Sequence, residues 1–402
     1  MIDLKAARAD PDAYRSALAR KGAGAVEAFD SVLDWDEKWR ALVPRVDDLR
    51  SRVKFKGKPT PEQIAALQDV KEELKQVEAE LKIAEEERDA ALQKIPNPPH
   101  ESAPDGDTDE DAEEVSRWGE PRQDGDTREH TEIGRFDMER AARLSGSRFG
   151  FLLGDTALLA MALYQYALNR LTAAGFTVML PPVLVREEAM YGTGFFPTER
   201  SNIYALKDDD LFLTGTSEVA LAGLHMGEIL EEDELPLRYS AFATNFRRES
   251  GAAGKDTRGM FRVHQFNKVE MFCYVKPEDS PAEHERLLEL EESMLQELGI
   301  PYRVVNVAAG DLGAPAVKKY DCEAWFPSQQ RYREVTSASN TTDYQARRLN
   351  IRFRRKGDGT EFVHTLNGTA VTDRWVLAIL ENFGGEVPEP LQAFGAPARI
   401  AP

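Results

Sequence analysis

Two heptad runs near the start of the chain, separated by a short break, constrain the fold more than any other feature. Apolar side chains recur at alternating spacings of three and four over residues 32–53 and again over residues 67–95, the pattern of helices that pack as a coiled coil. Gly57, Pro59 and Pro61 interrupt the pattern between the runs, so the chain must reverse there. The sequence therefore predicts an antiparallel helical hairpin with about 30 residues per helix and a length of roughly 45 Å.

One residue does not suit an uninterrupted first helix. Pro44 lies inside the first heptad run, where a proline removes a backbone hydrogen bond and clashes with the preceding turn at a cost of about 3 kcal/mol. Either the helix kinks near residues 40–44, or the helix of the hairpin starts at Pro44 and residues 32–42 form a separate helix. The sequence leaves both alternatives open.

The tip of the predicted hairpin is basic, although the chain carries a formal net charge of −19. Much of the negative charge lies in residues 105–114, which follow a group of prolines and have the composition of a solvated linker. Near the tip, five cations occur without an acid: Arg50, Arg52, Lys54, Lys56 and Lys58. Heptads alone are common in dimerisation elements, but a basic tip favours RNA, because polyanion binding requires positive surface.

A second informative region is residues 246–275, in which a glycine-broken loop separates two predicted strands. On the second strand, Phe266 and Glu270 share one face and lie roughly 13 Å apart. On the first, Arg247 and Glu249 are expected to share the adjoining face. A guanidinium, two carboxylates and an aromatic ring on one surface suit a phosphate, a purine and an ammonium or hydroxyl group. Considered alone, this hairpin is equally well explained by a solvated sheet edge.

A third region, residues 365–383, places a cation at the start of a helix. The helical spacing i, i+3, i+4, i+7 is met by Val376, Ile379, Leu380 and Phe383. Arg374 therefore lies in the first turn, where the helix dipole disfavours a cation and favours an anion. This suggests that a negative ligand faces Arg374. The alternative is an exposed arginine neutralised by Asp373.

With these segments in place, the chain resembles the seryl-tRNA synthetase family of class II aminoacyl-tRNA synthetases. The three ordered motifs of the class are matched by residues 175–185, 246–272 and 367–383. Further segments that resemble this family in particular are residues 213–218, 307–313, 333–340 and 345–348. The resemblance covers nearly the whole chain and is weakest in residues 98–145.

The predicted fold class is α+β: a class II catalytic domain on an antiparallel sheet, preceded by an N-terminal antiparallel coiled-coil arm. The arm, a tRNA-binding domain, is expected over residues 1–97 and the catalytic domain over residues 98–402. Within the latter, an acidic, proline-rich linker is expected at 98–120 and a weakly ordered tail at 384–402. Helices are expected at 155–174, 217–230, 281–298 and 373–383.

The resemblance implies an ATP-dependent ligase that converts L-serine to seryl-adenylate and passes the seryl group to tRNA(Ser), with tRNA(Sec) an open alternative acceptor. The basic cluster at the tip of the arm is then expected to bind the tRNA. Such a first step needs positioning and charge stabilisation and no nucleophilic residue. Residues 175–185 resemble the dimer motif of the family, which predicts a homodimer.

By the same resemblance, the ATP site comprises Arg247, Arg248, Glu249, Val263, Phe266, Glu334, Val335, Thr336, Ser337 and Arg374. The catalytic pair would be Arg247 at the α-phosphate and Arg374 at the γ-phosphate, with Phe266 stacked on the base. Glu334 and Ser337 would ligate Mg²⁺, which prefers hard oxygen ligands. Because these two residues are three apart, they fall on opposite faces of a regular strand, so a bulge or bend is needed for both to reach the metal.

The serine site implied by the resemblance comprises Thr216, Ser217, Glu218, Arg247, Glu270 and Thr369. Groups that pair with the serine hydroxyl would be left unpaired by alanine, and such sites discriminate by about 10⁴ or more. Threonine carries one extra methyl group, which must be excluded by shape near Thr369.

Composition excludes other classes. No run of about 18 apolar residues could span a membrane, and the chain has only two cysteines, which predicts a reducing, cytoplasmic location. Two rival functions are an amino acid:carrier-protein ligase and a non-catalytic RNA-binding paralogue. The predicted hairpin with its basic tip disfavours the carrier-protein ligase, because such a ligase lacks the tRNA arm. The second should have lost site residues, yet the chain retains Arg247, Glu249, Glu270, Glu334 and Arg374.

Overall fold

The computed structural model describes residues 1–54, 61–122, 125–250, 259–357 and 359–401, without the side chains of residues 61–66. The chain divides into two compact units, Met1–Pro98 and Pro99–Pro402. They are called the N-terminal unit and the C-terminal unit below.

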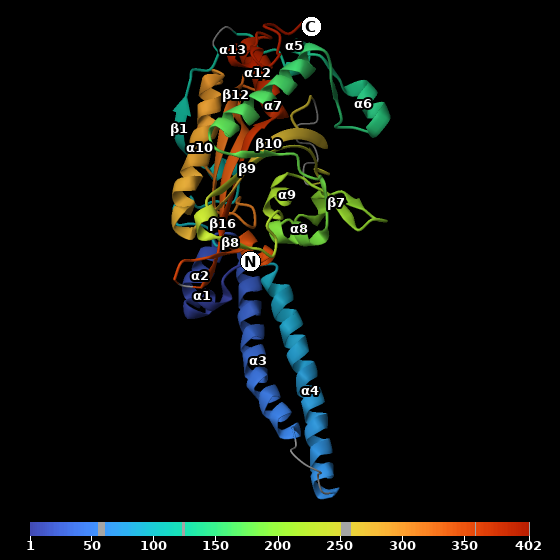
Figure 1. Ribbon diagram of the computed structural model, residues 1–402. Helices are drawn as coiled ribbons and strands as arrows, with labels where there is room; N and C mark the ends of the chain where they lie inside the picture. Colours follow the sequence, from blue (N-terminus) through green and yellow to red (C-terminus); the bar gives the residue numbers. More distant parts are fainter. Residues whose placement is uncertain (55–60, 123–124, 251–258, 358, 402) are drawn as a thin grey trace. The chain divides into compact units, whose positions relative to one another are not determined.

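The N-terminal unit consists of α1 (Leu4–Ala9), α2 (Pro11–Ala19) and two long helices, α3 (Ala23–Val53) and α4 (Pro61–Leu92) (Figure 1). The long helices form the predicted antiparallel hairpin, with Val46, Leu49 and Val77 buried between them. Ion pairs join their exposed faces, such as Arg45 to Glu73 at 2.8 Å. A separate helix over residues 32–42 is therefore wrong, because α3 continues through Pro44.

An eight-stranded sheet in the order β1-β11-β12-β13-β16-β10-β9-β4 forms the centre of the C-terminal unit. Neighbouring strands are antiparallel, except for β4 and β9, which are parallel. This confirms the predicted α+β class. The strands are β1 (Glu113–Trp118), β4 (Thr177–Met179), β9 (Leu237–Phe246), β10 (Gln265–Val275), β11 (Tyr302–Asn306), β12 (Lys318–Phe326), β13 (Arg331–Thr342) and β16 (His364–Thr372).

Three helices cover one face of this sheet: α7 (Asp155–Ala173), α10 (Ser280–Glu297) and α12 (Asp373–Phe383) (Figure 1). Their apolar side chains, among them Leu163, Leu287 and Val376, pack in one core with Val269 and Met271 of β10. Successive side chains of a strand point to opposite faces. The intervening residues of β10, including Lys268 and Glu270, therefore lie on the other face.

Shorter elements complete the C-terminal unit. They are η1 (Asp109–Asp111), α5 (His130–Ile133), β2 (Phe136–Asp137), α6 (Met138–Ser145), β3 (Phe151–Leu152), β5 (Leu184–Val185), α8 (Glu187–Thr193), η2 (Arg200–Asn202), β6 (Ala205–Leu206), β7 (Leu211–Leu213), α9 (Glu218–Ala222), β8 (Ile229–Glu231), η3 (Glu232–Glu234), η4 (Pro277–Asp279), α11 (Tyr344–Leu349), β14 (Arg352–Arg354), β15 (Thr360–Phe362) and α13 (Glu389–Gln392).

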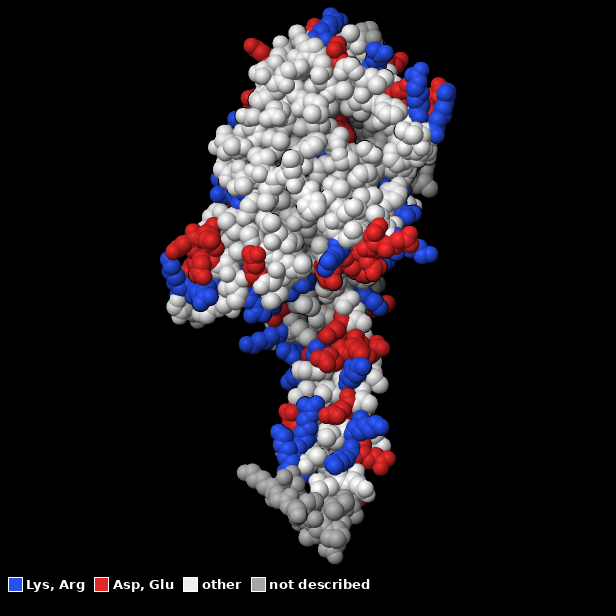
Figure 2. Space-filling model, turned by 45° about the vertical axis from the view of Figure 1, so that its right-hand side comes forward, with Lys and Arg blue, Asp and Glu red and all other residues white. Residues whose placement is uncertain are grey.

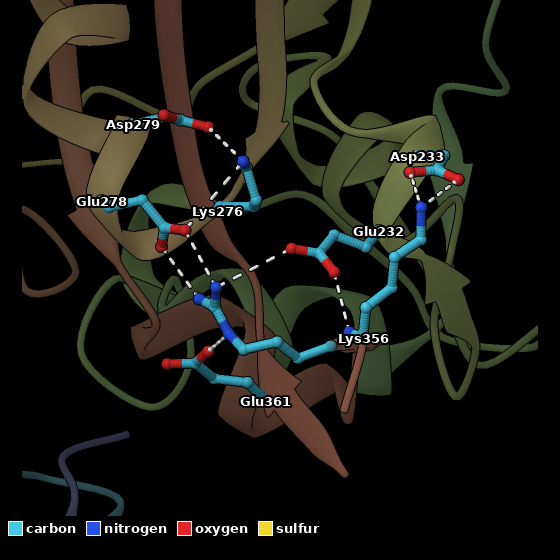
Figure 3. A network of polar contacts seen from close by, with 8 residues as sticks. Glu232, Asp233, Lys276, Glu278, Asp279, Lys356 and Glu361 are labelled. Carbon is cyan, nitrogen blue, oxygen red and sulfur yellow. Dashed lines mark hydrogen bonds and ion pairs between the residues drawn. The ribbon is translucent and has the colours of Figure 1, made fainter. Parts of the chain in front are cut away.

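An exposed ion-pair network ties the β14–β15 hairpin to η3 and η4 (Figure 3). Arg355 makes a bidentate pair with Glu278, with nitrogen–oxygen distances of 3.0 and 2.9 Å, and also contacts Glu361 at 2.7 Å. The Lys356 ammonium pairs with Asp233 at 2.6 Å. Since exposed pairs each contribute only about 0.2–1 kcal/mol, this network fixes the position of the hairpin more than it stabilises the fold.

Several expectations for the C-terminal unit are wrong at the level of individual segments. The helix expected at 217–230 ends at Ala222, because Gly223 follows and residues 229–231 form β8. The expected linker at 98–120 contains β1, which extends the central sheet by pairing with β11. The expected weakly ordered tail at 384–402 contributes Leu391 and Ile400 to the core. In the expected linker and the expected tail, tertiary contacts outweigh local composition.

Candidate active site

The face of the sheet opposite α7, α10 and α12 carries two adjoining hollows of about 130 and about 460 Å³. They are called the smaller and the larger hollow below. Charged and hydroxyl-bearing side chains line both: Arg247, Glu249, Arg262, Lys268, Glu334, Ser337, Thr369 and Arg374. The arrangement therefore brings together residues from the second and third motif regions, 246–272 and 367–383, and from the segment 333–340.

Arg247 lies just beyond the end of β9, at the junction of the two hollows. Its backbone N–H donates to the carbonyl of His264 at 2.9 Å, which extends the pairing of β9 with β10 by one residue. Its side-chain Nε donates to the carbonyl of Gly215 at 3.0 Å, and the guanidinium carbon lies 5.2 Å from the centre of the Phe266 ring. These contacts fix the guanidinium before any ligand binds.

The expectation that Arg247 and Glu249 share a strand face is wrong. The strand ends at Phe246, and Glu249 has a left-handed backbone conformation with φ of 52°. The Glu249 carboxylate turns toward Arg262, whose Nη1 donates to it at 2.6 Å. Both Arg247 and Glu249 nevertheless line the two hollows.

Arg374 occupies the first turn of α12, as predicted. Its Nη1 donates to the carbonyl of Glu334 at 3.0 Å, and its guanidinium carbon lies 4.6 Å from the centre of the Phe261 ring. Burial lowers the pKa of Arg374 from its usual value, but a guanidinium stays protonated in proteins. The site is therefore cationic where the helix dipole is also positive.

Asp373 does not neutralise Arg374. Its carboxylate is buried and accepts hydrogen bonds from the Tyr164 hydroxyl and, at 2.8 Å, from the backbone N–H of Asn267. The alternative explanation of Arg374 as an exposed arginine paired with Asp373 is therefore wrong. Asp373 instead connects α12 to α7 and β10.

Of the bulge or bend expected between Glu334 and Ser337, the structure has a bulge. Thr336 faces Cys322 of β12, whereas Glu334 faces the next residue, Glu323, so Val335 is the extra residue in β13. The bulge places both Glu334 and Ser337 at the two hollows. Burial opposes ionisation of Glu334, but the charges of Lys319 and Arg374 prevail and hold its pKa well below the usual range.

A cluster of buried polar side chains lies in the larger hollow. The Lys268 ammonium donates to the Thr216 hydroxyl at 2.7 Å and pairs with the Glu270 carboxylate. The Thr216 hydroxyl in turn donates to Glu270 at 3.2 Å. A hydroxyl and a carboxylate thus converge on one cation, a geometry that would equally suit the ammonium of a small ligand.

Glu218 forms the second carboxylate of this cluster. Its Oε1 accepts hydrogen bonds from Gln345 at 2.7 Å and from Asn367 at 3.1 Å. Burial, followed by the nearby charge of Glu270, raises the pKa of Glu218 to about 7. Its charge therefore changes near neutral pH.

The structure brings together most, though not all, of the residues expected in the site. Val263, Phe266, Val335 and Thr336 line the smaller hollow, Thr216, Glu218 and Glu270 the larger one, and Thr369 both. Ser217 and Arg248 are absent from the described linings of both hollows. Arg248 instead donates to the carbonyl of Ile203 at 3.1 Å and lies over the Tyr204 ring.

Several residues of the site were missed from the sequence, among them Lys268, Arg262, Gln345 and Asn367. Lys268 shares a strand face with Glu270 and Phe266, so the period of two could have identified it. Arg262 lies between Phe261 and Val263, outside any regular strand. Gln345 and Asn367 reach Glu218 from α11 and β16, and no local pattern signals contacts across more than a hundred residues.

The basic cluster of the arm is only partly described. Arg50 pairs with Glu78 at 2.9 Å and Arg52 with Asp48 at 3.6 Å, while Lys54 is exposed. Lys56 and Lys58 lie outside the described residues. Within the described ranges, three or more metal-ligating side chains do not gather at any point, and every helix is too short or too polar to cross a membrane.

Comparisons with known proteins agree with this architecture. A family model described as the seryl-tRNA synthetase N-terminal domain matches residues 1–99, and one described as the tRNA synthetase class II core domain (G, H, P, S and T) matches residues 203–383. A serine–tRNA ligase of Thermobifida fusca is 48% identical, with 98% of this chain and 97% of the relative covered. One of Rhodococcus jostii is 47% identical, with 98% of each covered.

Solved structures agree as well. Seryl-tRNA synthetase from Pyrococcus horikoshii, complexed with ATP, superposes with a TM-score of 0.94 at 38% identity, and all of both chains is covered. The cytoplasmic serine–tRNA ligase of Naegleria fowleri, in complex with AMP, gives 0.88 at 34% identity, with 97% of this chain and 95% of that one covered. The chain therefore belongs to the seryl-tRNA synthetase family of class II aminoacyl-tRNA synthetases.

Proposed function

We propose that this chain activates L-serine with ATP, forming seryl-adenylate and pyrophosphate, and then transfers the seryl group to the terminal ribose of tRNA(Ser). One observation carries the proposal: fixed guanidinium groups and a buried pair of carboxylates lie in two adjoining hollows. Family membership supports the same reaction, since the relatives are named as serine–tRNA ligases. Similar structures bind ATP or AMP.

ATP would lie across the smaller hollow. Arg247 and Arg374 are held by carbonyl groups and aromatic rings, so they are preorganised for the α- and γ-phosphates. Donors that are fixed in advance stabilise developing charge without further reorganisation. Phe266, beside Arg247, would stack on the adenine ring.

Glu334 and Ser337 fit a Mg²⁺ ion that arrives with the nucleotide. Mg²⁺ in such sites commonly takes one or two carboxylates and completes its shell with water and substrate phosphates. Glu334 supplies an ionised carboxylate and Ser337 a hydroxyl, and both line the two hollows. When bound, the metal would neutralise phosphate charge.

Serine would occupy the larger hollow. Its ammonium would meet Thr216 and the carboxylates of Glu218 and Glu270, and Lys268 already marks where a cation is stabilised among them. Its hydroxyl would pair with Glu270 and Thr369. Alanine would leave these groups unpaired, and this discriminates between substrates more strongly than the exclusion of one methyl group does.

We further propose a homodimer. Strand β4 lies at one end of the described sheet order, and Val178 and Leu180 in this segment are 42% and 81% exposed. Met161 of the neighbouring α7 is 64% exposed. A broad area of the C-terminal unit in Figure 2 also shows few charged side chains. A second copy, related by a two-fold axis, would pair with this edge and cover the apolar side chains.

The N-terminal hairpin would bind the tRNA, with its basic cluster against phosphates. Lys and Arg side chains alternate with Asp and Glu along the described part of the hairpin (Figure 2).

The proposal also includes a cytoplasmic location. Cys273 and Cys322 are free and buried, which is in keeping with a reducing compartment.

The test measures serine-dependent ATP–pyrophosphate exchange together with tRNA charging by the full chain. The proposal expects both activities. An amino acid:carrier-protein ligase would show exchange but no charging, and a non-catalytic RNA-binding protein would show neither. Either result would contradict the proposed function, and the same assay with tRNA(Sec) decides the alternative acceptor.

A further inference from the structure

A short segment at the edge of the smaller hollow, residues 259–261, is held by α12 at two separate points. At the first point, Arg374 donates from Nε to the carbonyl of Phe261 at 3.4 Å and lies over the ring of the same residue. Arg333 lies over this ring as well, with its guanidinium carbon 3.8 Å from the ring centre. Phe261 therefore holds the Arg374 guanidinium together with the carbonyl of Glu334, which accepts from Nη1 at 3.0 Å.

The second point of attachment runs through His130. Glu381 is buried and lies about two turns beyond Arg374 on α12. Its Oε1 lies 2.8 Å from Nδ1 of His130 and accepts the His130 backbone N–H at 3.2 Å. On the opposite edge of the ring, Nε2 accepts the backbone N–H of Met260 at 3.1 Å. Since Nε2 is an acceptor, the ring proton lies on Nδ1 and is donated to Glu381.

The segment also passes close to Nε2 of the imidazole. Gly259 has φ of +68°, and a Cβ atom added there would lie 2.6 Å from His130 Nε2. The His130 side chain is itself buried and makes an edge-to-face contact with Phe136, at 5.8 Å between ring centres. The ring therefore cannot move away without disturbing the backbone of residues 259–261.

We propose that His130 is a positioning residue for ATP: it fixes Met260 so that Phe261 presents its carbonyl group and its ring to Arg374. The inference rests on the proposed function, because Arg374 is the group proposed to bind the γ-phosphate. His130 was not among the site residues expected from the sequence, and it lies in residues 98–145, where the resemblance to the family is weakest. It touches no reacting atom and acts through residues 260, 261 and 374.

A pair of variants separates the two hydrogen bonds of the ring. In H130N, the amide can still donate to Glu381 but is too short to reach Met260. In H130Q, the amide oxygen reaches about the position of Nε2 and can accept the Met260 N–H. H130N should raise KM for ATP and weaken direct ATP binding roughly tenfold, the scale for a buried N–H left without its acceptor. KM for serine should stay close to wild type, and H130Q should recover most of the loss.

The matched control is H225N. His225 also lies in the C-terminal unit and bonds to Glu228 at 2.7 Å and Tyr239 at 2.9 Å, but it belongs to the described lining of neither hollow. Its variant should keep both KM values. A purely structural role for His130 would lower thermal stability without separating the two substrates.

Two results from folded H130N would overturn the proposal: an unchanged KM for ATP, or equal rises in KM for ATP and for serine. A folded H130Q that does not recover the loss would overturn it as well. If H130N does not fold, G259A displaces the same segment through the short contact with the ring. A folded G259A with wild-type ATP binding would also overturn it. Titration calorimetry measures ATP binding without serine, so it tests the role of His130 separately from the proposed function. The proposed function is contradicted instead if the wild type lacks serine-dependent exchange.

Discussion

Replacing Arg247 with alanine should slow serine activation by about 10² or more. The wild-type guanidinium is fixed by a 3.0 Å hydrogen bond to the carbonyl of Gly215 and by the ring of Phe266. Loss of one such preorganised donor costs roughly 3–4 kcal/mol in the transition state. The fold loses much less, about 1 kcal/mol for the hydrogen bond and about 0.5–1 kcal/mol for the cation–π contact. The variant should therefore fold and still be slow.

The assay is serine-dependent ATP–pyrophosphate exchange at saturating substrates, with thermal melting followed by circular dichroism. R247K should be intermediate, because lysine keeps the charge but not the planar, bidentate donor. R248A is the matched control: the neighbouring arginine binds Ile203 and Tyr204 instead of lining either described hollow. Near-wild-type exchange by folded R247A, or equal losses in both alanine variants, would refute the assignment of Arg247 to the transition state.

Three further predictions concern the arm, the serine site and assembly. Replacing Lys54, Lys56 and Lys58 with Glu should impair tRNA charging at subsaturating tRNA and make charging less sensitive to salt. Pyrophosphate exchange should stay unchanged. Unaltered charging would contradict the proposal that the tip binds tRNA. Glu218, with a pKa raised to about 7, ionises as the pH rises, and only its ionised form attracts an ammonium. KM for serine should therefore fall between about pH 6 and 8, and a similar fall in E218Q would contradict this reasoning. Light scattering should report twice the chain mass of 45.0 kDa, with a shift toward the single-chain mass in L180D; a wild-type mass near 45.0 kDa would exclude the dimer.

The parts of the fold that the sequence predicted are those with strong local patterns. Heptad spacing identified the hairpin, and helical spacing placed α12 and hence Arg374 in its first turn. An irregularity near Val335 followed from a simple requirement, since Glu334 and Ser337 can share a face only if the strand bulges or bends there, and the structure has the bulge. These inferences needed no knowledge of distant contacts.

Where prediction failed, distant contacts decided the structure. Residues 384–402 have the composition of a loose tail, but Leu391 and Ile400 pack into the core of the C-terminal unit. The hydrogen bond from Gln345 to Glu218 joins residues 127 positions apart, and the contact of His130 with Met260 joins residues 130 positions apart. Spacing along a single strand or helix contains no signal for such pairs.

The most direct test of the central claim is the amino-acid dependence of ATP–pyrophosphate exchange by the wild-type chain. If Glu270 and Thr369 pair with the substrate hydroxyl, exchange should be strong with L-serine and about 10⁴-fold or more weaker with L-alanine. Exchange driven equally well by alanine, or by another amino acid in preference to serine, would contradict the assignment of the larger hollow as a serine site.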